Sequence, residues 1–75
     1  MLRILADFNA LSPDGNRVPV NEFASDESQK FCVGRRVIVY EPEDFEVEAV
    51  LERVKLEDGR EVWDAVIDWS TRHNL

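Results

Sequence analysis

From residue 36 onward, apolar and polar side chains alternate with the two-residue period that is typical of β-strands. A β-branched and aromatic run over residues 37–40 predicts one strand. Residues 41–44 then read Glu-Pro-Glu-Asp, and Pro42 suits the second position of a type I turn. Residues 45–56 and 60–69 predict two further strands, joined by a turn. The pattern therefore predicts three consecutive antiparallel strands, which is a β-meander.

The turn between the last two predicted strands decides how their residues pair. A two-residue type I′ turn at Asp58 and Gly59 would pair Glu57 with Arg60 and would scatter apolar and acidic side chains over both faces. A type I turn closed by Gly59 in a G1 bulge would instead pair Leu56 with Arg60. Only the second register gives a continuous apolar face, so we predict that one.

In the predicted register the two faces of this hairpin differ in character. The apolar face carries Val47, Ala49, Leu51, Trp63, Ala65, Ile67 and Trp69. The opposite face carries Glu46, Glu48, Glu52, Asp64 and Asp68, with valines between them. Glu48 then opposes Asp68, and Glu52 opposes Asp64. Arg53 lies opposite Trp63.

The first half of the chain is less regular. Residues 2–8 predict a strand whose apolar side carries Leu2, Ile4, Ala6 and Phe8. A Ser-Pro-Asp-Gly turn follows, in which Gly15 takes a positive φ. Residues 17–20 can form only an edge strand, because Pro19 has no N–H to donate to a ladder.

Residues 21–31 are polar, and two interpretations stay open for them. They can form a single helical turn, with Ser25 as its N-cap, Asp26 and Glu27 in the first turn and Lys30 near the end. They can equally form a loop.

About five short strands in 75 residues predict a mainly β fold, a small bent sheet closed into a partial barrel with at most one short helical turn. Three stretches resemble SH3 domains. Leu5-Ala6-Asp7-Phe8-Asn9-Ala10 is similar to their opening segment, Val33-Gly34-Arg35-Arg36-Val37 to their turn into a strand, and Trp63-Asp64-Ala65 to their Trp-x-Ala strand. The resemblance implies a five-stranded SH3-like partial barrel. It does not imply their recognition of proline-rich peptides, because Ala6 replaces the tyrosine that contacts the peptide and the closing Pro-x-Asn-Tyr segment is absent.

Composition narrows the classes of function. The chain has 9 basic and 16 acidic residues, a net charge of −7, which favours basic partners or plain solubility and argues against binding along a nucleic-acid backbone.

The length of the chain predicts one domain, residues 1–75. No window approaches the roughly 18 apolar residues that span a bilayer, and the N-terminal apolar run is too short for a signal peptide. With Cys32 as the single cysteine, we expect a cytoplasmic protein without an intramolecular disulfide.

The acidic face is the first candidate site. Directly opposed carboxylates destabilise a sheet, so Glu48, Glu52, Asp64 and Asp68 would need a basic strand, a basic partner or a divalent cation, unless the face is simply solvated. Asp64 and Asp68 lie roughly 13 Å apart along a strand, too far for a shared metal. Pairing with arginines, within one molecule or between two copies, is the simplest interpretation of the candidate basic patch formed by Arg3, Arg17, Lys30, Arg35 and Arg36.

The aromatic and nucleophilic residues are weaker candidates. Trp63 and Ile67 are expected in the core, whereas Trp69, beside a polar tail, suits a core and a binding role equally. Cys32 is expected to be a buried thiol, and His73 lies near a terminus where chains fray, so neither indicates catalysis.

We therefore predict a non-catalytic protein-interaction module without a cofactor or a metal. It would bind a protein partner through the acidic face, an exposed sheet edge or the Trp69 end, and the edge would also allow self-association. The alternative is a small barrel associated with nucleic acid or the ribosome, in which aromatic and basic side chains form the contact surface.

Overall fold

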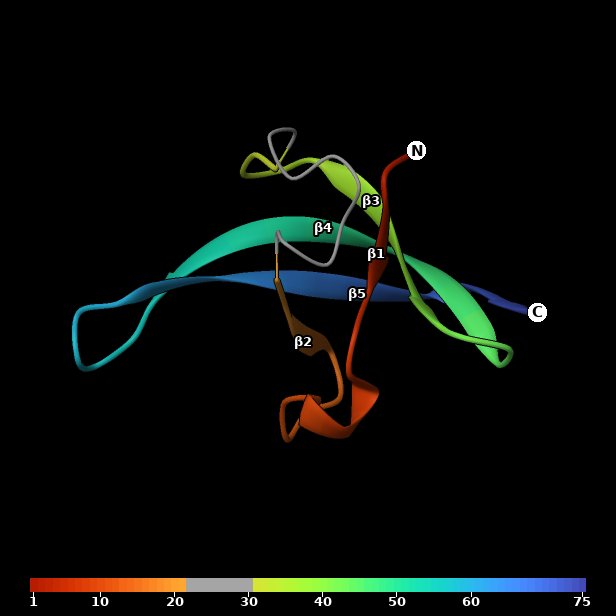
Figure 1. Ribbon diagram of the computed structural model, residues 1–75, viewed down its shortest axis with the longest axis horizontal. Helices are drawn as coiled ribbons and strands as arrows, with labels where there is room; N and C mark the ends of the chain where they lie inside the picture. Colours follow the sequence, from red (N-terminus) through yellow and green to blue (C-terminus); the bar gives the residue numbers. More distant parts are fainter. Residues whose placement is uncertain (22–30) are drawn as a thin grey trace.

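The computed structural model describes residues 1–21 and 31–75, and these residues form a five-stranded mixed sheet (Figure 1). The strands are β1 (Arg3–Leu5), β2 (Arg17–Val20), β3 (Arg36–Glu41), β4 (Phe45–Lys55) and β5 (Glu61–Asn74). A 3₁₀-helix, η1 (Phe8–Ala10), follows β1. The helical turn considered at Ser25 lies outside the described residues.

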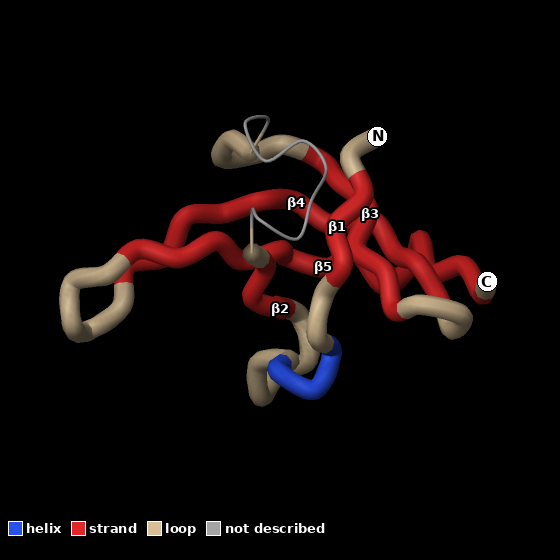
Figure 2. The backbone as a smooth tube through the Cα atoms, in the orientation of Figure 1, coloured by secondary structure: helices blue, strands red, loops and turns tan. Residues whose placement is uncertain are grey.

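The order of strands in the sheet is β1-β3-β4-β5-β2. The predicted antiparallel meander is confirmed as β3, β4 and β5, while β1 pairs with β3 in parallel and β2 pairs with β5 antiparallel. The two outer strands do not pair with each other, so the sheet is not closed. Figure 2 shows the turn between β4 and β5 at one end of the sheet and the C-terminus at the other.

The predicted register of the β4–β5 hairpin is confirmed. The amide of Leu56 donates to the carbonyl of Arg60 at 2.7 Å, and Gly59 has a φ of 90°, as a G1 bulge requires. Arg53 pairs with Trp63. The hairpin therefore has one buried face and one acidic face, as the alternation of side chains predicts.

The core lies on the inner face of the sheet. Its buried members are Leu2, Ile4, Ala6, Val18, Val20, Val37, Val39, Phe45, Val47, Ala49, Leu51, Ala65 and Ile67. Trp63 is partly buried and packs against this cluster. Full burial of a side chain the size of leucine contributes roughly 1.5–3 kcal/mol, so the long β4 strand supplies a large share of the stabilising surface.

Strand β5 is longer than the sequence predicts. It continues to Asn74, and His73 pairs with Glu46 instead of fraying. A register shift between Glu46 and Glu48 allows this continuation. At the shift, β5 residues 69–72 lie opposite a single β4 residue, Val47. In this bulge the hydroxyl of Thr71 donates to the carbonyl of Asp68 at 2.7 Å and accepts from the amide of Glu48 at 2.8 Å.

Three local predictions are wrong. Phe8 does not continue β1 but begins η1, whose N-cap is the Asp7 carboxylate. The turn after β3 is of type II and not type I, because Glu43 has a φ of 62° while the amide of Asp44 donates to the carbonyl of Glu41. Cys32 is exposed, not buried.

The predicted turn before β2 and the edge position of β2 are confirmed. The amide of Gly15 donates to the carbonyl of Ser12 at 2.8 Å, and Gly15 has a φ of 74°. Strand β2, which contains Pro19, lies at the edge of the sheet. In the described part of the chain, no helix has the length or the hydropathy needed to cross a membrane.

Candidate functional site

The predicted acidic face contains two directly opposed carboxylate pairs. The first is Glu48 with Asp68. Arg36 of β3 bridges this pair, with its Nε 2.6 Å from Glu48 Oε1 and its Nη2 2.9 Å from Asp68 Oδ2. These hydrogen bonds raise the pKa of Arg36. The pKa of Asp68 is lowered, first by the hydrogen bond from the Ser70 hydroxyl and then by Arg36.

The second opposed pair, Glu52 with Asp64, lies on the same face and is bridged by an arginine from the strand that flanks the hairpin at its other edge. Arg17 of β2 places its Nη1 2.5 Å from Glu52 Oε2 and 3.8 Å from Asp64 Oδ2. The two flanking strands thus each supply one arginine to a pair of carboxylates that would otherwise repel each other. The two guanidinium groups offset half of the charge of the four carboxylates, which lowers the attraction of this face for a basic partner.

Trp69 is partly exposed, at 37% of its surface, but it is held in place. Its indole Nε1 donates to the carbonyl of Gly15 at 2.7 Å. Its ring centroid lies 6.3 Å from that of Phe8 and 6.0 Å from that of Phe45, both in tilted arrangements. Trp69 therefore ties β5 to the turn before β2 and to the aromatic end of the core.

The outer edge of β2 has few groups to offer to another strand. The carbonyl of Asn16 accepts from the amide of Ile67. The backbone N–H and C=O groups of Asn16 and of alternate residues after it therefore point toward β5, and those of Arg17 and Pro19 point away from the sheet. The amide of Arg17 donates to the hydroxyl of Ser12 at 3.1 Å, and its carbonyl accepts from the amide of Ser12. Pro19 has no N–H. This edge is therefore blocked as a donor for strand pairing.

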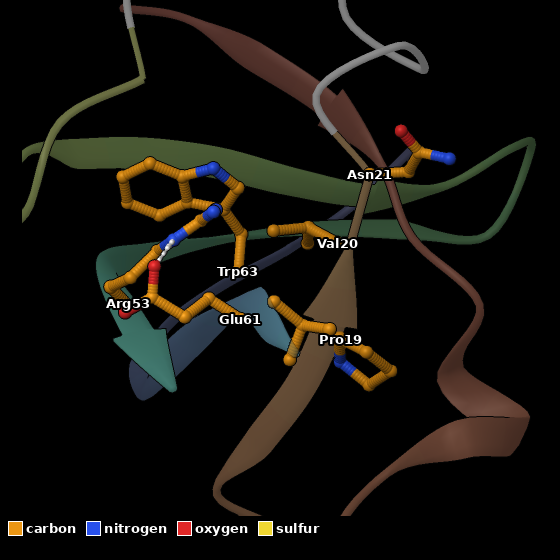
Figure 3. Close-up of a pocket in the computed structure, with 7 residues that line it drawn as sticks. Pro19, Val20, Asn21, Arg53, Glu61 and Trp63 are labelled. Atoms are coloured by element: carbon orange, nitrogen blue, oxygen red, sulfur yellow. Dashed lines mark ion pairs between the residues drawn. The ribbon is translucent and has the colours of Figure 1, made fainter. Parts of the chain in front are cut away.

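A groove of about 380 Å³ opens where β2 meets the turn end of the β4–β5 hairpin (Figure 3). Its walls come from β2, β4, β5 and the residue after β2: Pro19, Val20, Asn21, Arg53, Glu61, Val62 and Trp63. Figure 3 shows Trp63, Arg53 and Glu61 on one side of this groove and Pro19 and Val20 on the other. Because the pairing of Arg53 with Trp63 follows from the register, the sequence contained a signal for one wall of this groove, but it did not identify the groove as a site.

On the hairpin wall the Trp63 ring is in contact with Arg53, Phe31 and, through Arg53, Glu61. The Arg53 guanidinium carbon lies 4.9 Å from the centroid of the Trp63 ring, a cation–π distance. The Trp63 ring also meets Phe31 edge to face, with centroids 5.6 Å apart at 85°. Arg53 Nε is 3.7 Å from Glu61 Oε2, which is an ion pair but longer than a hydrogen bond. The ring is fixed by its neighbours and in turn orients the guanidinium.

A second cavity, of about 470 Å³, lies between the ends of β1 and β2. It is lined by Leu5, Ala6, Asp7, Pro19, Asn21, Glu41 and Pro42. It contains no cationic or aromatic side chain among these residues, so it has less capacity for specific recognition than the Trp63 groove. Within residues 1–21 and 31–75, no group of three His, Cys, Asp or Glu side chains is placed to hold a metal ion.

No protein-family model matches the chain, and neither the curated proteins nor the solved structures contain a significant match.

Proposed function

We propose that the chain is a non-catalytic, cytoplasmic interaction domain built on an SH3-like small barrel, and that it binds an extended segment of a protein partner in the Trp63 groove. The observation that carries the proposal is the stack of Arg53 on Trp63 at the wall of that groove. Tryptophan and arginine are among the side chains most enriched where protein interfaces concentrate their binding energy. The groove volume also falls within the range of small recognition pockets.

The groove is a better candidate than the sites expected from the sequence. The carboxylates of the acidic face already bind Arg17 and Arg36. The indole N–H of Trp69 already donates to Gly15. A partner at either of those places would have to replace existing hydrogen bonds, whereas the groove offers a partly exposed aromatic ring beside apolar β2 residues and an Arg53–Glu61 ion pair that is longer than a hydrogen bond.

A protein partner is favoured over nucleic acid by charge. Binding along a phosphate backbone gains its affinity from arginine and lysine side chains that release counterions. Here the chain carries a net charge of −7, and Arg3, Arg17, Arg36 and Arg60 are each paired with a carboxylate. Association with nucleic acid or the ribosome remains the competing proposal, and the same experiment tests it.

The experiment is a selection of peptides from a random phage-displayed library on the immobilised domain. Enriched peptides are then labelled and titrated against the wild type, Arg53→Gln and the matched control Arg72→Gln, which removes the same charge from another aromatic stack. We expect binding to Arg53→Gln to be at least roughly tenfold weaker, because hot-spot truncations cost more than about 1.4 kcal/mol, and binding to Arg72→Gln to be unchanged. Circular dichroism verifies that each variant is folded.

Two results would contradict the proposal. One is a set of enriched peptides that bind Arg53→Gln as tightly as the wild type. The other is a library without enriched peptides together with saturable, salt-sensitive binding of labelled single-stranded RNA, which would favour the nucleic-acid alternative.

A further inference from the structure

Arg53 differs from four other arginines of the chain in how its charge is satisfied. Arg3, Arg17, Arg36 and Arg60 each donate a hydrogen bond to a carboxylate. Within the described part of the chain, Arg53 makes no such hydrogen bond, and its one carboxylate neighbour is Glu61 at 3.7 Å. The guanidinium of Arg53 therefore keeps donor capacity that those four arginines have already spent on carboxylates.

Arg72 provides the internal comparison. It also stacks on an aromatic ring, with its guanidinium carbon 4.5 Å from the centroid of Phe45. It lines neither of the two cavities. Arg53 thus combines a stacked guanidinium with a position in the wall of a groove.

The guanidinium of Arg53 is a planar fork of N–H donors, and this fork matches the geometry of a carboxylate. The apolar lining of the groove comes from Val20, which pairs with Trp63, and from Val62 and the exposed Pro19. We infer that the groove recognises a partner segment with an acidic side chain flanked by apolar residues, whose carboxylate binds Arg53. This inference rests on the proposed function and gives the chemical class of its ligand.

A side-chain carboxylate fits this groove better than a C-terminal one. Capture of a chain terminus uses several converging backbone N–H groups. The β2 edge beside the groove does not supply them, because the amide of Arg17 donates to Ser12 and Pro19 has no N–H. The cation available in the groove is the side chain of Arg53.

Glu61 is the intramolecular competitor of such a ligand. Its carboxylate partly neutralises Arg53 from 3.7 Å without forming a hydrogen bond. Replacing it with an isosteric amide removes this competition and leaves the shape of the groove almost unchanged. Glu61→Gln is therefore expected to bind an acidic segment more tightly than the wild type.

The test uses two probes, acetyl-Val-Glu-Val-amide and acetyl-Val-Gln-Val-amide, titrated into the ¹⁵N-labelled full chain at constant ionic strength. The readouts are the Nε–H signals of Arg53 and Arg72 and the indole signal of Trp63. We expect the glutamate probe to give saturable shifts at Arg53 and Trp63. The glutamine probe should bind at least roughly tenfold more weakly, since a hydrogen bond to a charged group contributes about 1.5–3 kcal/mol. Glu61→Gln should strengthen binding of the glutamate probe.

Equal binding of the two probes, or equal shifts at Arg53 and Arg72, would overturn the inference. The two proposals can fail separately. If library peptides bind the groove through Arg53 and keep their affinity when each acidic residue is changed to its amide, the preference for a carboxylate is wrong and the interaction domain stands. If the glutamate probe binds selectively at Arg53 while no library peptide binds the groove, the carboxylate site stands and the role in peptide recognition is wrong.

Discussion

Replacing Trp69 separates a role in the stability of the fold from a role in binding a partner. Its indole N–H donates to the carbonyl of Gly15 at 2.7 Å, and its ring contacts Phe8 and Phe45. A neutral hydrogen bond contributes about 0.5–1.5 kcal/mol, and each aromatic pair contributes about the same beyond the area it buries. Trp69→Phe should therefore destabilise the fold by about 1 kcal/mol, and Trp69→Ala by about 3 kcal/mol.

The assay is urea unfolding followed by far-ultraviolet circular dichroism, because fluorescence would lose one of its two tryptophan signals in these variants. The control is the binding of library peptides to Trp69→Phe, which should match the wild type once the variant is folded. The structural role of Trp69 is refuted if the free energy of unfolding of Trp69→Ala stays within about 0.5 kcal/mol of the wild type and the variant loses peptide binding. That result would make Trp69 a binding residue and not a structural tie.

Two further predictions concern the turn after β3 and the bulge in β5. Glu43→Gly should stabilise the fold by up to about 1 kcal/mol in thermal unfolding, because a side chain at a φ of 62° is strained; a lower melting temperature would contradict this. Ser70→Ala should raise the pKa of Asp68 toward its unfolded value, as followed by carbon NMR. Because the folded pKa is the lower one, the stabilisation from Asp68 is present above its unfolded pKa of about 3.9 and is lost as the pH falls through the folded pKa. Ser70→Ala should therefore lose less stability on acidification than the wild type, and an unchanged Asp68 pKa would contradict this assignment.

The sequence predicted the features that depend on short-range constraints. The period-two pattern and Gly59 together fixed the register of the β4–β5 hairpin, because a slip of one residue would have exposed Leu51. Pro19 placed β2 at an edge, because it cannot donate to a ladder on both sides. The interpretation of the basic residues as partners of the acidic face also holds for Arg17 and Arg36.

Features that depend on contacts between distant segments were not predictable in this way. The continuation of β5 lacks apolar alternation and is made by a bulge, which lets polar residues pair with the start of β4. The parallel pairing of β1 with β3 has no local signal. The groove was not predicted from the sequence for the same reason. The register places Arg53 opposite Trp63, but Pro19 and Val20 come close to them only through the pairing of β2 with β5.

We expect a partner to bind in the Trp63 groove, and NMR signals of the groove side chains report binding there. The chain has two tryptophans and therefore two indole N–H signals. When a library-selected peptide is titrated into the ¹⁵N-labelled protein, we expect the chemical shifts of the Trp63 indole and of the Arg53 Nε–H to change until they saturate. The chemical shift of the Trp69 indole should stay unchanged. Movement of the Trp69 signal, or of the backbone amides of Glu48 and Asp68, with no change at Trp63 would contradict this expectation.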